Sequence, residues 1–485
     1  MSEHILFLTG KLAEKSLHQV LASMQPEFTY EVRNIGVSVA ALMTAKMVAR
    51  RVQALDSIDR IIVPGLCQGD TNELSDTLGT EVQRGPKDLK DLPAFFGHKA
   101  FVPDLSRYDV RIFAEIVDAP RMSIDAILQQ AQRYRDDGAD VIDIGSLPGL
   151  DFPHLETAVE ALVEAGYTVS VDSLQSDELV RGGQAGAHYL LSLNRSTLWV
   201  ADEVPSTPIL IPENPGDMDS LYEAIATLRD KGRDCIADSI LDPLHFGFTD
   251  AIIRYRELRQ QCPDMPIMMG IGNLTELTEA DTSGINAILF GIISELGITN
   301  VLATEVSPHA RAAVREGDRA RRIMFAAREA NSLPKGYSDE LLITHARKPF
   351  PSTPAEITEL AEAVKDPNYR VQISVDGIHV FNRDGMSIGH EPFELFPELE
   401  QLTDDAPHAF YMGVELARAQ IAWQLGKRYD QDEELGWGAA LPPDQQTSDA
   451  GAAAHALKPG TRQEFKEIGS TMKASRKNKQ VKGEK

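Results

Sequence analysis

Acidic side chains interrupt several apolar runs of this 485-residue sequence. Asp143 lies inside "VIDIG", Asp172 inside "VSVDS", and Asp238 and Asp242 inside "IADSILDP". An ionised carboxylate buried without a partner costs several kcal/mol or shifts its pKa by about 3–5 units. We therefore expect each acid to be paired, hydrogen-bonded, or placed at a strand end where it faces a ligand.

Such a set of acids suits three kinds of ligand. The two oxygens of one carboxylate can accept neighbouring N–H groups in the plane of a polar heterocycle such as a pterin, and an asparagine can both donate and accept there. The same oxygens suit Mg²⁺, and carboxylate pairs also serve glycosidases. Sugar sites usually carry aromatic platforms, whereas Trp199, the one tryptophan of residues 110–331, lies away from any clear strand end.

An alternation of strand-like and helix-like segments across residues 110–331 predicts the elements that position these acids. Amphipathic helical stretches, such as 123–138, 155–166 and 220–232, separate most of the strands. Eight evenly spaced strands favour a closed (β/α)8 TIM-type barrel, which usually takes about 250 residues, over an open doubly wound sheet. The strands are expected at 110–118, 139–145, 167–173, 187–194, 207–212, 234–243, 265–273 and 299–305.

An N-terminal unit, residues 1–109, precedes this segment. Its order of strand, helix, strand, helix and strand predicts a parallel α/β domain, whose role the sequence leaves unassigned. The third strand, 60–65, is followed by a stretch expected to be a loop, 66–74.

A third unit, residues 332–438, predicts a small α+β domain. It carries two alternating strands joined through Asp376-Gly377 and a long amphipathic helix that ends at Gly426. Residues 439–485 are rich in Ala, Pro and Gly and then basic, which is typical of a flexible tail. The fold class is therefore α/β, with a central barrel and two smaller flanking domains.

The carboxyl ends of barrel strands and the loops after them form the active site in folds of this kind. Asp238, Ile240 and Asp242 share parity and are expected on one side of a regular strand. The polar residues at or just beyond the expected strand ends are Glu115, Asp118, Asp143, Asp172, Ser192, Asn194, Glu213, Asn214, Asp238, Asp242, Asn273, Glu276, Thr304 and Glu305. The basic residues nearest a strand end are Arg195, His245, His309 and Arg311.

Composition narrows the expected partners and location. The formal net charge is −25, and such a surface repels nucleic acid and anionic lipid. The sequence has no apolar run of about 20 residues, and its first residues read as a strand, so neither a membrane span nor a signal peptide is expected. Its three cysteines are far apart, which suggests a reducing, cytoplasmic setting.

Several motifs together resemble a known family. "AQRYRDDGADVIDIGSLPG", "VSVDS" and "ILDPLHFGF" resemble, in that order, the marks of dihydropteroate synthases and related pterin-binding barrels. The stretches from Gly270 and from Leu302, with the helix "HAFYMGVELARAQIAWQLG", look closer to the synthase-related proteins of organisms that make tetrahydromethanopterin. The likeness covers roughly residues 110–435.

The resemblance implies roles for particular residues. Asp172 and Asp242 match the acids that hold the pterin ring, and Glu115 stands about where synthases place an Asn that helps hold Mg²⁺, here expected with Asp118. Further substrate contacts are expected from Asp143, Asn194, Asp238, Asn273, Glu276, Thr304 and Glu305, and phosphate contacts from Arg195, His309 and Arg311. Synthases carry a Ser-Arg-Lys loop after strand seven and an Arg after strand eight, whereas this chain has "GIGNLTEL" and "LATEVSPHA".

The implied activity is that of a dihydropteroate synthase-like transferase. It would join a hydroxymethyl-pterin diphosphate to an arylamine, expected to be a ribosylated aminobenzene phosphate. The product would serve the synthesis of a tetrahydromethanopterin- or folate-type coenzyme of one-carbon metabolism. Two alternatives stay open: a pterin-dependent methyltransferase-like barrel that acts with a corrinoid partner, and a pterin-binding protein without chemistry. The same resemblance implies a homodimer.

Overall fold

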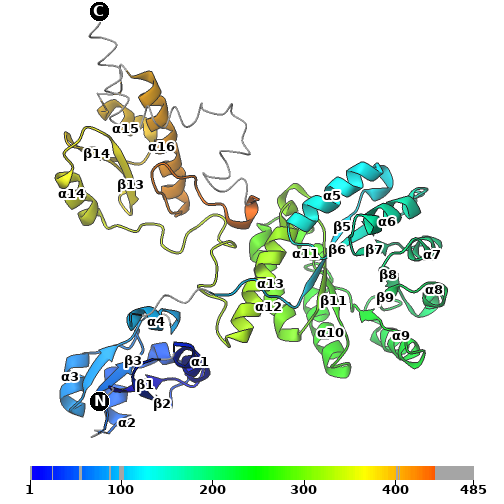
Figure 1. Ribbon diagram of the computed structural model, residues 1–485, viewed down its shortest axis with the longest axis horizontal. Coiled ribbons are helices and arrows are strands. Elements are labelled where there is room, and N and C mark those ends of the chain that lie inside the picture. The colour runs from blue at the N-terminus through cyan, green and yellow to red at the C-terminus, as the bar shows by residue number, and fades with distance from the viewer. Residues whose placement is uncertain are drawn as a thin grey trace, which may run out of the picture. The chain divides into compact units, whose positions relative to one another are not determined.

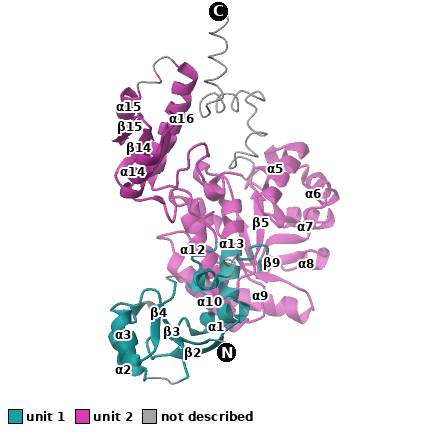
Figure 2. Ribbon diagram, turned by 60° about the vertical axis from the view of Figure 1, so that its left-hand side comes forward, with its two compact units in different colours: residues 1–109, 321–337 teal, residues 110–320, 338–485 magenta. Residues whose placement is uncertain are grey.

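The structure is a computed structural model that describes residues 3–24, 26–53, 57–86, 89–97, 103–399, 402 and 405–442. The chain divides into two compact units, residues 1–109 with 321–337 and residues 110–320 with 338–485 (Figure 2). The boundary expected after residue 109 coincides with this division, whereas residues 321–331, expected at the end of the barrel segment, belong to the first unit. From residue 443 onward, the expected tail lies outside the described residues.

The second unit contains eight parallel strands in the order β10-β9-β8-β7-β6-β5-β12-β11. They are β5 (Arg111–Ile116), β6 (Val141–Gly145), β7 (Val169–Asp172), β8 (Tyr189–Leu193), β9 (Thr207–Leu210), β10 (Ile236–Ala237), β11 (Met268–Gly270) and β12 (Asn300–Ala303). Ala237 forms a bridge with Ile267, and its N–H donates to the carbonyl oxygen of Pro266 at 3.0 Å, which joins the two ends of the sheet. The predicted TIM-type barrel and its eight strands are confirmed.

Helices follow the strands and surround them (Figure 1). They are α5 (Ile124–Asp136), α6 (Leu155–Glu164), α7 (Ser176–Gln184), α8 (Val200–Glu203), α9 (Met218–Asp230), α10 (Phe248–Gln261), α11 (Gly272–Thr275), α12 (Thr282–Leu296) and α13 (Ala313–Glu329). The sequence marks several of their ends: the Ser123 side chain accepts the Ala126 N–H at the start of α5, and Gly297 closes α12 with a left-handed φ of 63°.

The barrel interior explains why acids can follow apolar residues on the same strand. One cluster of buried side chains fills it: Phe113, Val141, Leu191, Ile209, Ile236 and Met268. Phe113 precedes Glu115 by two residues and Val141 precedes Asp143 by two residues, so each acid shares the inward face of its strand with an apolar neighbour. The apolar layer forms the floor, and the acids lie one layer nearer the carboxyl ends.

The N-terminal part of the first unit is a four-stranded parallel sheet in the order β2-β1-β3-β4. Its elements are β1 (His4–Thr9), α1 (Glu14–Met24), β2 (Thr29–Asn34), α2 (Ala45–Arg51), β3 (Arg60–Val63), α3 (Thr71–Leu78), β4 (Glu81–Arg84) and α4 (Leu92–Phe95). Alternation along β1 feeds two cores: Leu6 and Leu8 pack with α2 and α3, while Ile5 and Phe7 pack with α1.

The segment after residue 338 is a small α+β fold. It has an antiparallel sheet of β13 (Arg370–Ser374), β14 (Gly377–Asn382) and β15 (Gly385–Gly389), with the helices α14 (Pro354–Ala363), α15 (Pro392–Leu395) and α16 (Ala406–Leu425). The predicted turn through Asp376-Gly377 joins β13 to β14, and Gly426 caps α16 in a left-handed conformation. Across the part of the chain that the structure describes, no helix combines the length and hydrophobicity needed to cross a bilayer.

Three local predictions are wrong. The stretch 66–74 was expected to be a loop, but α3 begins within it and leads to a fourth parallel strand, β4. A third antiparallel strand, β15, follows the predicted pair. The strand expected at 234–243 is regular only over β10, and Ile240 takes a positive φ of 66°, so Asp238 and Asp242 do not share one side of a strand.

Candidate functional site

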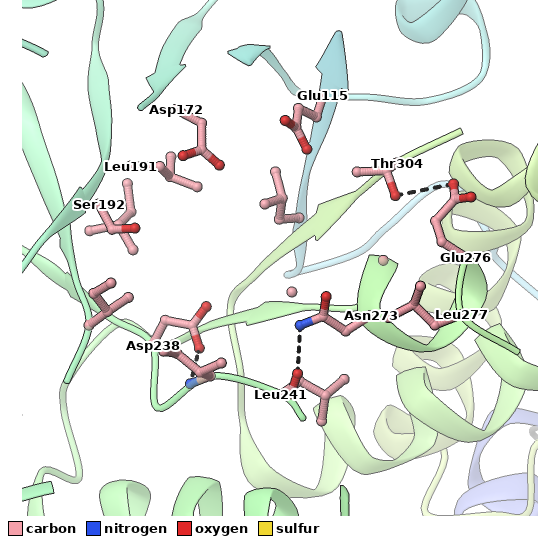
Figure 3. A pocket seen from close by; sticks show the side chains of 16 residues that line it. Glu115, Asp172, Leu191, Ser192, Asp238, Leu241, Asn273, Glu276, Leu277 and Thr304 are labelled. Atoms are coloured by element: carbon pink, nitrogen blue, oxygen red, sulfur yellow. Dashed lines mark hydrogen bonds between the residues drawn. The ribbon is translucent and has the colours of Figure 1, made fainter. Parts of the chain in front are cut away.

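A cavity of about 380 Å³ lies at the carboxyl ends of the barrel strands (Figure 3). Its polar lining consists of Glu115, Asp172, Ser192, Asp238, Asn273, Glu276 and Thr304. Its apolar lining consists of Leu191, Ile209, Ile211, Ile240, Leu241, Leu277 and Leu302, with Gly270 and Gly272 between β11 and α11. None of the described residues that line this cavity is Lys, Arg or His, so it offers four carboxylates and no basic group.

Three adjacent strands bring Glu115, Asp143 and Asp172 together. Glu115 on β5 pairs in register with Asp143 on β6, and Asp143 pairs with Ser170 on β7, two residues before Asp172. One carboxylate oxygen from each acid lies within 4.8 Å of the others. Gly145 leaves room for this arrangement, because a Cβ atom there would collide with the carboxylate of Glu115.

Burial makes these three carboxyl groups hard to ionise. Burial first, and then the nearby carboxylates of Asp172 and Glu276, raise the pKa of Glu115 to about 8. Burial raises the pKa of Asp172 to about 7. Burial, Asp172 and Glu115 hold the pKa of Asp143 well above its usual range, although the Ser170 hydroxyl donates to it. The group therefore attracts protons or another positive partner.

Asp238 lies where the chain leaves β10. Its Oδ1 accepts the Tyr255 hydroxyl at 2.5 Å and the Ile240 N–H at 2.7 Å. Burial raises the pKa of Asp238 to about 6, against the lowering effect of these hydrogen bonds and of Arg254. The bond to Tyr255, on α10, fixes the carboxylate at the cavity wall, opposite Glu115 and Asp172 (Figure 3).

Asn273 and Glu276 organise the loops beyond β11 and β12. The Asn273 Nδ2 donates to the carbonyl oxygen of Leu241 at 2.7 Å, so it ties the loop after β11 to the loop after β10. Glu276 accepts the Thr304 hydroxyl at 3.2 Å and the N–H groups of Val306 and Ser307 at 2.8 and 2.7 Å. Both side chains line the cavity while holding its rim in place.

Besides Asp143, three other predicted substrate residues lie outside the cavity lining. Asp242 pairs with Arg254 on α10 at 2.6 Å. Glu305 is buried and pairs with Arg133 at 2.7 Å; burial raises its pKa to about 7 although Arg133 lowers it. Asn194 caps the turn after β8 by accepting the Ser196 N–H at 2.9 Å. Their roles in binding stay predictions.

The predicted phosphate and metal ligands are also apart from the cavity, except Glu115. Arg195 pairs with Glu213 at 2.5 Å and with Glu223 at 2.7 Å. The His309 ring lies 3.1 Å from the Thr275 carbonyl oxygen, and Arg311 is exposed. Asp118 is mostly exposed and pairs with Arg121 at 3.3 Å.

The sequence reasoning missed two groups that shape the site. Tyr255, which is fully buried and holds Asp238, lies inside an ordinary amphipathic helix, and nothing in its local sequence distinguishes it. The apolar lining, which includes Ile211, Leu241 and Leu277, was also not predicted, because the prediction covered only polar residues at strand ends. These apolar side chains lie among the polar groups that line the cavity.

A second hollow, of about 600 Å³, lies at the opposite, amino ends of the strands. It is lined by Arg111, Tyr189, Thr207, Arg229, Gly232, Arg233, Asp234, Cys235, Ile236, Asp264, Met265 and Pro266. Arg111 donates to Tyr189 Oη at 2.6 Å and to Asn300 Oδ1 at 3.1 Å, and Arg233 donates to the carbonyl oxygens of Val204 and Ser206 at 2.9 and 3.1 Å. The basic side chains here tie strands and loops together.

Comparisons with known proteins give a consistent but coarse result. Residues 3–87 match the model of a family of unknown function, DUF6513. The uncharacterized protein MJ0107 of Methanocaldococcus jannaschii is 26% identical over 527 residues, which span 89% of this chain and 98% of that protein. The likeness to MJ0107 therefore extends over nearly the whole of both chains.

Solved structures similar to this chain include dihydropteroate synthases. One from Yersinia pestis, with a pterine-sulfa conjugate, is 22% identical with a TM-score of 0.37, covering 47% of this chain and 95% of the synthase. One from Vibrio fischeri is 16% identical with a TM-score of 0.38, covering 48% and 96%. Scores this low say nothing of the reaction. The order and parallel pairing of the eight strands are enough to identify the fold as a TIM-type barrel, without these comparisons.

Proposed function

We propose that this protein binds a pterin in the carboxyl-end cavity and acts as a dihydropteroate synthase-like transferase in the synthesis of a tetrahydromethanopterin- or folate-type coenzyme. The observation that carries the proposal is a cavity of about 380 Å³ with carboxylates and an amide around its edge and apolar side chains between them. Ligand pockets of this size, with few polar groups placed among apolar ones, commonly bind small flat molecules.

Recognition would rest on the hydrogen-bonding edge of the ring. A pterin presents an amino group and ring N–H groups, and carboxylates accept such pairs in the ring plane. Asp238, fixed by Tyr255, and Asp172, on the facing side, would accept these donors, with Asn273 beside them. The apolar side chains of Ile211, Leu241 and Leu277 would cover the faces of the ring.

The proposed reaction is a displacement at the methylene carbon of the pterin. The arylamine nitrogen forms a bond to that carbon, the carbon–oxygen bond to diphosphate breaks with its electron pair going to diphosphate, and the nitrogen loses one proton to solvent. Positive charge develops on the pterin side as the bond breaks. The carboxylates of Asp172 and Asp238 would stabilise it because both line the cavity and hydrogen bonds already orient Asp238.

The departing diphosphate gains negative charge and needs a cationic partner. No described residue that lines the cavity is basic, so this lining does not supply it. A divalent cation would supply that neutralisation when bound. The pair expected to hold it does not form a shared site, since Asp118 pairs with Arg121 and lies outside the cavity lining while Glu115 lies within it.

A second candidate function follows from the same lack of basic side chains. An unphosphorylated reduced pterin would fit a carboxylate-lined cavity without a counter-charge for phosphate. This favours, as the alternative, a methyltransferase-like barrel acting with a corrinoid partner or a pterin-binding protein without chemistry.

The test is incubation of the full chain and Mg²⁺ with 6-hydroxymethyl-dihydropterin diphosphate and each of several arylamines, followed by measurement of released diphosphate. Release that depends on one amine, and is lost in Asp172→Asn but kept in the exposed control Asp118→Asn, supports the transferase. Tight pterin binding without release contradicts the transferase and supports a binder. Demethylation of a methylated pterin that requires a corrinoid contradicts the transferase and supports the methyltransferase.

A further inference from the structure

The cluster of Glu115, Asp143 and Asp172 is the strongest unexplained feature of the barrel. Its three carboxylates come from the neighbouring strands β5, β6 and β7, so rigid sheet pairing rather than flexible loops sets their spacing. Oxygens from all three lie within 4.8 Å of one another. Among the described residues, this is the one group of three or more His, Cys, Asp or Glu side chains whose possible ligand atoms gather this closely.

One carboxylate oxygen of Asp143 is buried and has no hydrogen-bond partner among the described residues, which suggests that a ligand lies beside it. Asp143 has no solvent-exposed surface. Its Oδ1 accepts the Ser170 hydroxyl, but its Oδ2 is buried and has no hydrogen-bond partner in the described structure. An unsatisfied carboxylate oxygen in such a place carries a large desolvation cost unless a proton or a cation lies beside it.

We infer that Glu115, Asp143 and Asp172 hold a divalent cation of the Mg²⁺ class at the inner wall of the cavity. Hard cations of this kind take oxygen ligands, and Mg²⁺ usually combines carboxylates with waters and substrate phosphates. Glu115 and Asp172 line the cavity, so a cation on them is open to a ligand there, while Asp143 anchors it from below. Three ionised carboxylates against a charge of +2 leave a local net charge of −1 instead of −3.

This inference deepens the proposed function. The role of the cation as a partner for diphosphate rests on that function, whereas the binding of the cation does not. It also replaces the expected pair of Glu115 and Asp118, because only Glu115 of that pair belongs to the cluster. Binding of the metal is measured without any pterin, so the metal site and the proposed function can fail separately.

The direct test titrates the metal-free full chain with Mn²⁺, a spectroscopic substitute for Mg²⁺, and follows free Mn²⁺ by electron paramagnetic resonance. We expect one Mn²⁺ per chain, displaced by excess Mg²⁺. Asp143→Asn keeps the shape of the buried side chain and is expected to weaken binding roughly tenfold or more. Asp118→Asn, which changes an exposed carboxylate outside the cluster, is expected to leave it unchanged.

Two results would overturn the inference. One is an absence of stoichiometric Mn²⁺ binding to the wild-type chain, which would leave protons as the partners of the cluster. The other is binding that Asp118→Asn removes and Asp143→Asn retains. A thermal melt with and without Mg²⁺ guards against misfolding: the cation is expected to raise Tm in the wild-type chain and not in a folded Asp143→Asn variant.

Discussion

At the carboxyl ends of the barrel strands, the cavity is lined by four carboxylates and by no basic residue among those described, whereas the hollow at the amino ends is lined by three arginines and two aspartates. The two ends belong to the same eight strands. At the amino end, Arg111 and Arg233 are engaged with side-chain and carbonyl oxygens of the barrel itself. At the carboxyl end, Asp143 has a buried oxygen that no described residue contacts through a hydrogen bond.

The difference separates charged groups that are paired within the barrel from a carboxylate oxygen that has no hydrogen-bond partner among the described residues. Hydrogen bonds from Arg111 connect the start of β5 to residues at the starts of β8 and β12, so this charge has a structural purpose. At the other end, burial raises the pKa values of Glu115 and Asp172, and nearby carboxylates raise that of Glu115 further, so the ionised forms of these acids are costly. Sites that carry such strain are commonly functional.

The largest effect that sharpens this comparison is expected from Asp172→Asn. The amide replaces a charged acceptor with a neutral one, so affinity for a reduced pterin should fall about a hundredfold, as expected for the loss of a charge-assisted hydrogen bond. Isothermal titration calorimetry measures the affinity, and Tm should stay within a few degrees of the wild type. Equal binding by the variant would place the ring elsewhere.

The next effect concerns pH and Asp238. Its folded pKa, about 6, lies above its ordinary value, so the folded protein binds this proton more tightly and loses stability as pH rises from about 4 to about 6. Asp238→Asn removes that loss, which should amount to at most about 2 kcal/mol. Tyr255 and Arg254 contact or face this carboxyl from α10, and both stay in place.

Urea unfolding of wild-type and Asp238→Asn chains at pH 4.5 and pH 7 measures this effect. The variant should lose less stability than the wild type between the two values. The other cavity acids are common to both chains, so their contribution cancels in the comparison. An identical pH dependence would mean that Asp238 ionises normally.

At the amino end, Arg111→Met should lower the free energy of unfolding by about 1–2 kcal/mol, because it leaves the Asn300 Oδ1 and the Tyr189 hydroxyl without this donor. Pterin affinity should be unchanged. Urea unfolding and calorimetry provide the two measurements. Arg229→Met, at an exposed arginine of the same hollow, is the matched control, with an expected change below about 0.5 kcal/mol. A loss of pterin affinity in Arg111→Met would break the separation of the two ends.

The smallest effect distinguishes the two acids beyond β10. Asp238→Asn should weaken pterin binding about tenfold, since it lines the cavity, and Asp242→Asn less than about threefold, since its carboxylate is engaged by Arg254. Calorimetry on both variants under one condition settles the order. The reverse order would restore the role that the family resemblance gives to Asp242.

The sequence was sufficient to predict the barrel because period and spacing carry that information. Each strand is a short apolar run, and the amphipathic helices between them are long enough to cross back over the sheet. Glu115, Asp143 and Asp172 were found because acids inside apolar strands are costly unless used. Their mutual approach depends on strand register, which no local pattern specifies.

The remaining site residues depend on contacts that are distant in sequence. The partner of Asp242 is Arg254 on α10, and the partners of Arg195 are Glu213 and Glu223, so neither pairing can be read from the strand ends alone. The turn at Ile240 follows from the same tertiary contacts: Arg254 donates to the carbonyl oxygens of Ser239 and Ile240 at 3.3 and 3.0 Å. The prediction that Asp238 and Asp242 share one side of a strand therefore failed, because the regular strand ends before these residues.

Because β10 is short, the barrel has a weakly paired junction between β10 and β11, which we call the seam. Between β10 and the segment before β11, the described ladder has one bridge, from Ala237 to Ile267. Nearer the carboxyl ends, the Asn273 side-chain amide donates a hydrogen bond to the Leu241 carbonyl oxygen. Backbone amides along such a weakly laced edge should exchange with solvent sooner than those of the neighbouring strands. A ligand that contacted both Asp238 and Asn273 would connect the two sides of this seam. Its binding should therefore be measurable as slower hydrogen exchange of the backbone amides at the seam.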